Sequence, residues 1–285
     1  MPKTYNEIYI DSRKKLKEMN VPAYGLEARF IVANAAGKTM DAFLRDLRLY
    51  ASKEVEEKAE EMISRRQDGE PVAYITGEWE FYGLPMAVTR DVLIPRTDTE
   101  VLVDTALEYL KNKKMDARVL DLCTGSGCVG CAIAKKLSGS RVTLIDNSMK
   151  ALAVAKQNVW KNKLNPRVSC ILADALLPPP MMLGSFDLLV CNPPYIPTED
   201  IAGLDDSVRV FEPVYALDGG VDGMDFYRAI LAKWKNAVRT GGMMMFEVGI
   251  GQAEDLALLM RASGLSNVGF VKDTLDIDRV VFGSV

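Results

Sequence analysis

The sequence feature that most constrains the fold is a buried strand that two prolines bring to an end. Phe186–Cys191 (FDLLVC) is a largely apolar run with no turn residue inside it, which is typical of a strand buried on both faces of a sheet. It is followed by Asn192-Pro193-Pro194-Tyr195, and a proline has no N–H to donate to a strand ladder. The chain therefore leaves the sheet at the carboxyl end of this strand, where open α/β sheets bind their ligands.

Strand-like and helix-like segments alternate on both sides of this strand. The expected strands are 118–122, 141–145, 168–172, 186–191 and 243–248, and the expected helices are about 128–137, 150–161, 226–239 and 253–263. Two further strands, 268–272 and 279–282, are expected to close the chain as an antiparallel hairpin. This alternation predicts a doubly wound α/β fold with a mostly parallel seven-stranded sheet.

The first part of the chain has a different pattern. Apolar residues recur at spacings of three and four in 5–19, 24–36, 40–50 and 52–66, so residues 1–70 are predicted to form a small helical-bundle domain. Residues 71–95 contain short β-like segments and are predicted to form a β-hairpin linker to the α/β domain at 96–285. A helix is expected from about Thr97 to Asn112, with Thr97 or Asp98 as N-cap and Glu100 completing a capping box. The helical block is interpreted either as a docking surface or as a structural cap.

The Asn192–Tyr195 turn carries groups that suit a planar –NH2 group. Asn192 offers a side-chain carbonyl, and a turn of two prolines exposes backbone carbonyls with few competing donors. Tyr195 adds a flat ring that can stack on an amide or a base. An amide nitrogen is a poor nucleophile because its lone pair is delocalised, and holding both of its hydrogens on acceptors can aim that lone pair at an electrophile. The turn alone does not distinguish a glutamine side chain from an adenine.

A second motif lies between the first expected strand and its helix. The turn Cys123–Gly127 (CTGSG) lacks the lysine and the spacing of a phosphate loop, and it lacks the three-glycine dinucleotide fingerprint. The strand before the turn contains Asp121, and a second acid, Asp146, ends the next strand, where a carboxylate can accept hydrogen bonds from ribose hydroxyls. A nucleoside cofactor without a pyrophosphate fits this pattern better than NAD, and we expect S-adenosylmethionine.

Composition excludes several classes of site. The 285-residue chain contains no histidine, which excludes Ser-His-Asp catalysis, Cys-His catalysis and His-ligated metals. Five cysteines without a signal-peptide-like apolar core predict reduced thiols in a cytoplasmic protein. Cys123, Cys128 and Cys131 have the spacing of a ferredoxin cluster, but the last two fall on an expected helix as small buried thiols, so we expect no metal. The formal charge of −4 gives no overall sign of a nucleic-acid binder, so we expect no direct nucleic-acid binding, although the net charge leaves a local basic groove open. No apolar run is long enough to cross a membrane.

Taken together, these motifs resemble those of class I, Rossmann-like S-adenosylmethionine methyltransferases that act on a planar nitrogen. Three further segments, IPRTDTE at 94–100, FEPVYALDGGVDGMDFYR at 211–228 and EVGIGQ at 247–252, resemble one family in particular, the HemK/PrmC protein-glutamine N5-methyltransferases. The resemblance covers essentially the whole chain. It implies methyl transfer from S-adenosylmethionine to the glutamine of the Gly-Gly-Gln motif in peptide chain release factors, with S-adenosylhomocysteine as the second product. It also implies that the helical domain docks the release factor.

The resemblance and the motif positions together nominate the site residues. The expected cofactor-binding residues are Asp121, Cys123, Thr124, Gly125, Ser126, Gly127, Asp146, Asp174, Ala175 and Asn192. The expected substrate-binding residues are Asn192, Pro193, Pro194, Tyr195 and Arg96, and the expected catalytic residues are Asn192, Pro193 and Tyr195. Cys123 departs from the glycine usual in the family, and Ala175 stands where some members have an aromatic ring. Because the methyl group is expected to pass directly to the amide nitrogen, we expect no strong base.

Three alternative interpretations remain at this point. A methyltransferase for a ribosomal-protein glutamine would share nearly every motif. An adenine-N6 nucleic-acid methyltransferase would need a basic groove and a base-flipping pocket, and a non-catalytic adaptor would not need intact cofactor and acceptor motifs. Residues 198–225 are long for a loop, acidic and next to the NPPY turn, so we expect them to gate substrate access.

Overall fold

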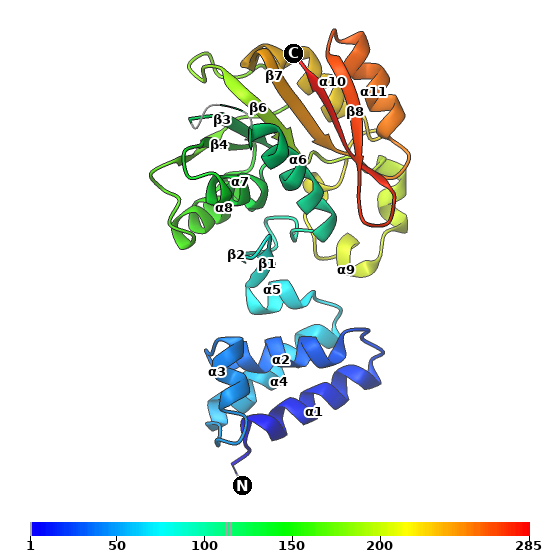
Figure 1. Cartoon of the computed structure of the whole chain (residues 1–285). Coiled ribbons are helices and arrows are strands. Elements are labelled where there is room, and N and C mark those ends of the chain that lie inside the picture. The colour runs from blue at the N-terminus through cyan, green and yellow to red at the C-terminus, as the bar shows by residue number, and fades with distance from the viewer. Residues whose placement is uncertain (1, 112, 114–115) are drawn as a thin grey trace. The chain divides into compact units, whose positions relative to one another are not determined.

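The computed structural model describes residues 2–111, 113 and 116–285. The chain divides into two compact units: residues 1–78 together with 206–211, and residues 79–205 together with 212–285 (Figure 1). None of the helices in the described residues is long and apolar enough to span a membrane.

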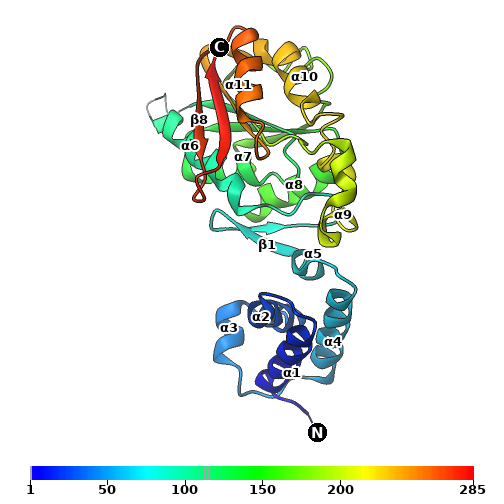
Figure 2. The same cartoon turned by 90° about the vertical axis from the view of Figure 1, so that its right-hand side faces the viewer.

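The first unit is a helical bundle (Figure 2). Its helices are α1 (Tyr5–Glu18), α2 (Tyr24–Ala35), α3 (Met40–Arg45), α4 (Lys53–Gln67) and α5 (Val72–Thr76), and the separate segment 206–211 adds α9 (Asp206–Arg209). The side chains of Thr4, Thr39 and Ser52 accept backbone N–H groups and so cap α1, α3 and α4. The four long helices predicted in this region are thereby confirmed, with α3 ending earlier than expected because residues 46–49 form turns.

Two local predictions in this part of the chain were wrong. Residues 72–76 form helix α5 rather than a β-like segment, because Pro71 suits the start of a helix and Gly77, at φ +71°, ends it with a left-handed cap. The helix near residue 100 also begins without the predicted capping box: a 3₁₀ turn at Thr97–Thr99 precedes α6 (Glu100–Lys111). Glu100 instead accepts the backbone N–H of Tyr82 in the β1–β2 hairpin at 2.8 Å. The expected helix end at Asn112 lies outside the described residues.

The second unit is built on a seven-stranded sheet in the order β5-β4-β3-β6-β7-β9-β8. The five parallel strands are β3 (Arg118–Leu122), β4 (Arg141–Asp146), β5 (Val168–Leu172), β6 (Phe186–Cys191) and β7 (Val238–Glu247). The antiparallel hairpin of β8 (Ser266–Lys272) and β9 (Asp278–Ser284) completes the sheet, as predicted. A small separate hairpin, β1 (Glu78–Phe81) and β2 (Leu84–Ala87), precedes it.

Helices cover both faces of this sheet (Figure 1). Alternate strand residues such as Val119, Leu144 and Val190 pack with α6, α7 (Cys128–Lys136) and α8 (Met149–Lys161). The residues between them, such as Leu120 and Leu189, pack with α10 (Asp225–Lys233) and α11 (Ala253–Ala262). Every residue of β6 is buried, because this strand lies inside the sheet with helices on both sides. The prediction of a doubly wound α/β sheet is confirmed.

Candidate active site

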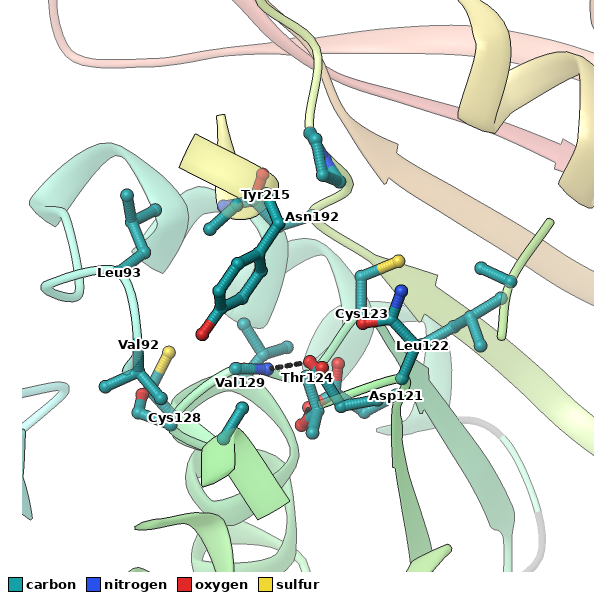
Figure 3. A pocket seen from close by; sticks show the side chains of 18 of the residues that line it. Val92, Leu93, Asp121, Leu122, Cys123, Thr124, Cys128, Val129, Asn192 and Tyr215 are labelled. Atoms are coloured by element: carbon teal, nitrogen blue, oxygen red, sulfur yellow. Dashed lines mark hydrogen bonds between the residues drawn. The ribbon is translucent and has the colours of Figure 1, made fainter. Parts of the chain in front are cut away.

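A cavity lies at the carboxyl ends of β3, β4 and β6. β3 is the first strand of the sheet in the chain, and the later strands β4 and β6 lie on opposite sides of it, so the cavity lies at the point where the strand order reverses. Figure 3 shows residues that line it, among them Asn192, Tyr215, Cys123, Thr124 and Asp121. Open α/β sheets characteristically bind ligands at this position.

The turn after β3 supplies backbone to one side of the cavity. Cys123, Gly125 and Gly127 have φ values of +59°, +53° and +80°, a region that glycine enters without the steric cost that other residues incur. This conformation accounts for the glycine usual at position 123 in the resembled family, and it means that Cys123 is held in a strained backbone state. The space next to the Gly125 Cα is open, so a ligand can approach the turn closely.

Asp121 stabilises this turn through hydrogen bonds. Its Oδ2 accepts the Thr124 hydroxyl at 2.6 Å and the Gly130 backbone N–H at 2.9 Å. Burial raises the pKa of Asp121 to about 7, although these hydrogen bonds oppose the shift. Asp121 borders the cavity, and its hydrogen bonds give it the role of shaping the turn.

Asp146 lies at the end of β4 with its carboxylate already partly engaged. Oδ2 accepts the Gly125 N–H at 2.9 Å, and Oδ1 accepts the Ser148 N–H at 2.9 Å. A carboxylate has about four acceptor positions, so each oxygen retains capacity for a ligand hydroxyl. Burial raises the pKa of Asp146, and the backbone N–H donors oppose that shift.

The Asn192–Tyr195 turn is held in place by a glycine-rich segment. Residue 196 pairs with residue 218 in a short parallel bridge, and the Gly219 N–H donates to the Ile196 carbonyl at 2.8 Å. A Cβ placed on Gly223 would lie 2.2 Å from the Tyr195 carbonyl oxygen, so only glycine allows this approach. The close packing explains the glycines of the sequence DGGVDG and makes the turn rigid.

Not all predicted site residues border the cavity. Asp121, Cys123, Thr124, Gly125, Ser126, Asp146, Ala175, Asn192, Pro194 and Arg96 line it. Gly127, Asp174, Pro193 and Tyr195 lie outside that lining. The Tyr195 ring packs against Gly249 and the core beneath α10 and α11, and burial raises the pKa of its hydroxyl to about 12.

Two aromatic residues that the motif analysis did not nominate lie in the cavity. Tyr215, from the segment 214–216, lines it and donates its hydroxyl to the Asp91 carbonyl at 2.6 Å, and Phe226 at the start of α10 also lines it. Both residues belong to the segment FEPVYALDGGVDGMDFYR, so the signal was present in the sequence. The sequence alone does not show that these two residues line the cavity, because the fold is what brings residues that are far apart in the chain together there.

Comparison with known proteins identifies the family. Residues 7–77 match the PrmC N-terminal domain, and residues 98–203 match the Methyltransferase small domain. The chain is 42% identical over 224 residues to the release factor glutamine methyltransferase of Geobacter sulfurreducens, covering 79% of this chain and 76% of that protein. It is 33% identical over 275 residues to the release factor glutamine methyltransferase of Clostridium botulinum, covering 96% and 97%.

The chain belongs to the release factor glutamine methyltransferase family. The resemblance inferred from the motifs is confirmed, and the matched methyltransferase domain confirms the predicted use of S-adenosylmethionine. The catalytic domain of hMettl16, solved in complex with MAT2A 3'UTR hairpin 1, shares the fold with a TM-score of 0.57. The two are 16% identical, and the alignment covers 78% of this chain and 80% of that chain, so this likeness shows the fold alone.

Within the family's IPRTDTE segment, Arg96 has a defined structural role. It forms an ion pair with Glu212, whose side chain is buried, and the other oxygen of Glu212 accepts the Ile94 N–H at 3.3 Å. Burial raises the pKa of Glu212, and the charge of Arg96 opposes that shift. Arg96 therefore links the backbone of residues 94–96 to the segment that carries Tyr215. Arg96 and Tyr215 both border the cavity.

Proposed function

We propose that this protein transfers a methyl group from S-adenosylmethionine to the side-chain amide nitrogen (N5) of the glutamine in the Gly-Gly-Gln motif of peptide chain release factors. Membership of the release factor glutamine methyltransferase family supports the activity. The observation that carries the assignment to this cavity is the position of Asn192. Its side chain borders the cavity at the end of β6 and donates its Nδ2 hydrogen to the Thr99 hydroxyl at 3.3 Å.

The residues around the glycine turn fit the cofactor. Gly125 leaves open space beside the backbone, and Asp146 retains acceptor capacity on both carboxylate oxygens for ribose hydroxyls. We assign cofactor binding to these two residues together with Cys123, Thr124, Ser126 and Ala175, which border the same cavity. When bound, S-adenosylmethionine supplies an electrophilic methyl group on a positively charged sulfur.

The NPPY turn would bind and orient the acceptor amide. Asn192 Oδ1 and a backbone carbonyl of the Pro193–Pro194 pair each accept one hydrogen of the glutamine –NH2 group, which fixes the direction of its nitrogen lone pair. Tyr215 and Phe226 offer flat apolar surfaces within the cavity for planar groups. We assign Tyr195 a supporting role, because its carbonyl accepts the Gln252 side-chain N–H at 2.9 Å and its ring packs on Gly249.

The helical unit is proposed to dock the release factor. A whole-protein substrate needs contact area on the order of 1,000 Å² for a specific complex, which a pocket for one glutamine side chain does not provide. The division into helical domain 1–70, hairpin linker 71–95 and methyltransferase domain 96–285 stays a prediction. Residues 198–225 are proposed to gate the substrate, and the enzyme is proposed to act in the cytoplasm without binding nucleic acid directly.

The proposal is tested by following labelled methyl groups from S-adenosylmethionine. We expect label on an intact release factor, and we expect Gln→Ala or Gln→Glu in its Gly-Gly-Gln motif to abolish incorporation. DNA, single-stranded or duplex, should stay unlabelled. Label on adenine with none on release factor would contradict the proposal, and label on a ribosomal-protein glutamine alone would reassign the substrate.

A further inference from the structure

A buried carboxylate lies behind the acceptor turn and is not used by the mechanism proposed above. Glu247 is the last residue of β7, and its side chain is almost completely buried at 2% exposure. β7 pairs with β6 so that Phe246 is opposite Cys191, which places Glu247 level with Asn192 at the same end of the sheet. Within the described part of the chain, Glu247 Oε2 has no hydrogen-bond partner. A buried, incompletely paired carboxylate is costly, so its presence calls for an explanation.

The groups around Glu247 are donors aimed at it. The Thr99 hydroxyl and the Asn192 side chain face its carboxylate and favour the charged form, so they oppose the rise in its pKa. Asn192 Nδ2 also donates to Thr99 Oγ1 at 3.3 Å. Three side chains from three separate elements therefore form one polar cluster, in which Glu247, when ionised, can only accept.

We propose that Glu247 is a positioning residue for the acceptor amide: it keeps the Asn192 nitrogen turned into the protein and the Asn192 Oδ1 turned toward the cavity. An amide side chain can rotate by 180° and exchange its oxygen and nitrogen. In this site, rotation would bring Oδ1 against the Glu247 carboxylate and would remove the donor that Thr99 and Glu247 accept. The inverted Asn192 would present its own –NH2 group to the –NH2 group of the glutamine, and two donors cannot form a hydrogen bond with each other.

A second consequence of the cluster is electronic. When Glu247 is ionised, its negative charge attracts the Asn192 N–H hydrogens, which polarises the amide and makes Oδ1 a stronger acceptor. Charged groups from neighbouring elements surround this carboxylate. Arg279 on β9 attracts it and Asp98 of the 3₁₀ turn repels it, and Arg279 is itself shared between Asp98 and Asp273. The Tyr195 and Tyr227 side chains also lie within its field.

The inference rests on the proposed function, and two full-length variants test it. Glu247→Leu removes the acceptor, and Glu247→Gln keeps the shape and one acceptor oxygen but removes the charge. At saturating S-adenosylmethionine we expect the release factor methylation kcat to fall about 100-fold in Glu247→Leu and by a smaller factor in Glu247→Gln. The KM for release factor and the Kd for S-adenosylmethionine should change little, because the amide orientation affects the reacting geometry more than the binding.

Asp187→Asn is the matched control. Asp187 is also a buried carboxylate on a central strand, but it lies at the opposite end of β6 and accepts the Arg118 N–H at 2.8 Å. We expect this control to lower the thermal midpoint without lowering kcat. The inference is overturned if both Glu247 variants are folded and retain wild-type kcat, or if kcat, cofactor affinity and thermal midpoint fall together.

A spectroscopic measurement separates this inference from the proposed function. In ¹⁵N NMR of the full chain, the Asn192 Nδ2 hydrogens should exchange slowly with solvent in the wild type and at least about 10-fold faster in Glu247→Leu. Equal exchange rates would overturn the positioning role whatever the substrate is. If the wild type leaves release factor unlabelled, but Asn192 Nδ2 hydrogens still exchange faster in Glu247→Leu than in the wild type, only the proposed function is contradicted.

Discussion

At the scale of single residues, the cavity combines carboxylates that have different tasks. Asp121 is buried beneath the glycine turn, whereas Asp146 is partly accessible and has acceptor positions to spare. Glu247 is buried behind Asn192 and has one oxygen without a partner among the described residues. These differences in burial and pairing distinguish a residue that shapes backbone from one that can bind a ligand.

Asp146→Ala is expected to weaken S-adenosylmethionine binding by roughly 1.5–3 kcal/mol, the usual scale for a hydrogen bond to a charged group. Calorimetry on the folded variant measures this change. Asp116→Ala removes an exposed acid from the same unit and is the control, with affinity equal to that of the wild type. Unchanged affinity in Asp146→Ala would remove Asp146 from the cofactor site.

The stability of the enzyme should depend on pH through Glu247. Burial raises its pKa to about 7, with Arg279 and the Thr99 and Asn192 hydrogen bonds opposing the shift and Asp98 adding to it. Because this pKa is raised, the folded protein binds the Glu247 proton more tightly than the unfolded chain does. The resulting contribution to the free energy of unfolding is present in full below the ordinary pKa of glutamate and is lost as pH rises through about 7.

We therefore expect Glu247→Gln to gain stability relative to the wild type between pH 5 and pH 8, by about 2–3 kcal/mol. Denaturant unfolding of both proteins across this range measures the difference. Asp121, whose pKa is also raised to about 7, contributes equally to both proteins and cancels. A difference that does not vary with pH would show that Glu247 does not titrate in this range.

At the scale of elements, one buried asparagine joins three parts of the methyltransferase unit. Asn158 on α8 is completely buried, and its Oδ1 accepts the Ala87 N–H of β2 at 2.6 Å. Its Nδ2 donates to the carbonyls of Ala87 and Ser126, each at 2.9 Å. The helix, the small hairpin and the glycine turn are thus fastened at a single side chain, so the turn's position depends on α8.

Replacing Asn158 by alanine leaves buried backbone groups of Ala87 and Ser126 without partners. We expect the free energy of unfolding to fall by about 2–4 kcal/mol, which denaturant titration can measure. Asn165→Ala is the matched control, since Asn165 is exposed in the turn after α8, and its effect should stay within about 0.5 kcal/mol. A similar small effect in Asn158→Ala would mean that water satisfies the exposed groups.

At the scale of the whole molecule, chemistry and substrate docking are assigned to different units. All residues that line the cavity belong to the unit of residues 79–205 and 212–285. The helical unit also includes the segment 206–211 from the insertion after the NPPY turn, where the Phe211 ring lies against Gly69. The proposed gating segment 198–225 is therefore divided between the two units.

A chain that begins at Trp79 should still bind S-adenosylmethionine, because the proposed cofactor residues all lie beyond that point. Its kcat/KM for intact release factor should fall at least about 100-fold, since the docking area is lost, while a short Gly-Gly-Gln peptide should be methylated at a rate close to that of the full chain. Calorimetry and labelled methyl transfer on both substrates measure these quantities. Equal activity on intact release factor would assign the helical unit a structural role only.

The sequence by itself determined the class of fold, the succession of strands and helices along the chain, and the residues at the strand ends. Each strand and helix carries its own hydrophobic period, and Gly125, Pro193 and Pro194 act on their local backbone, so these features can be inferred from neighbours in the chain. β3, β5 and β6 have the predicted bounds. The motifs also indicated the family, which the matches to known proteins confirm.

Only the tertiary structure decided which of these residues share a surface. Tyr195 packs toward the core while Tyr215 reaches the cavity, and Glu100 accepts an N–H from the β1–β2 hairpin instead of capping its own helix. Glu247 meets Thr99 and Asn192 because parallel strands end at one edge of the sheet. Such contacts join residues that are distant in the chain, and their energies depend on burial and geometry that no local pattern contains.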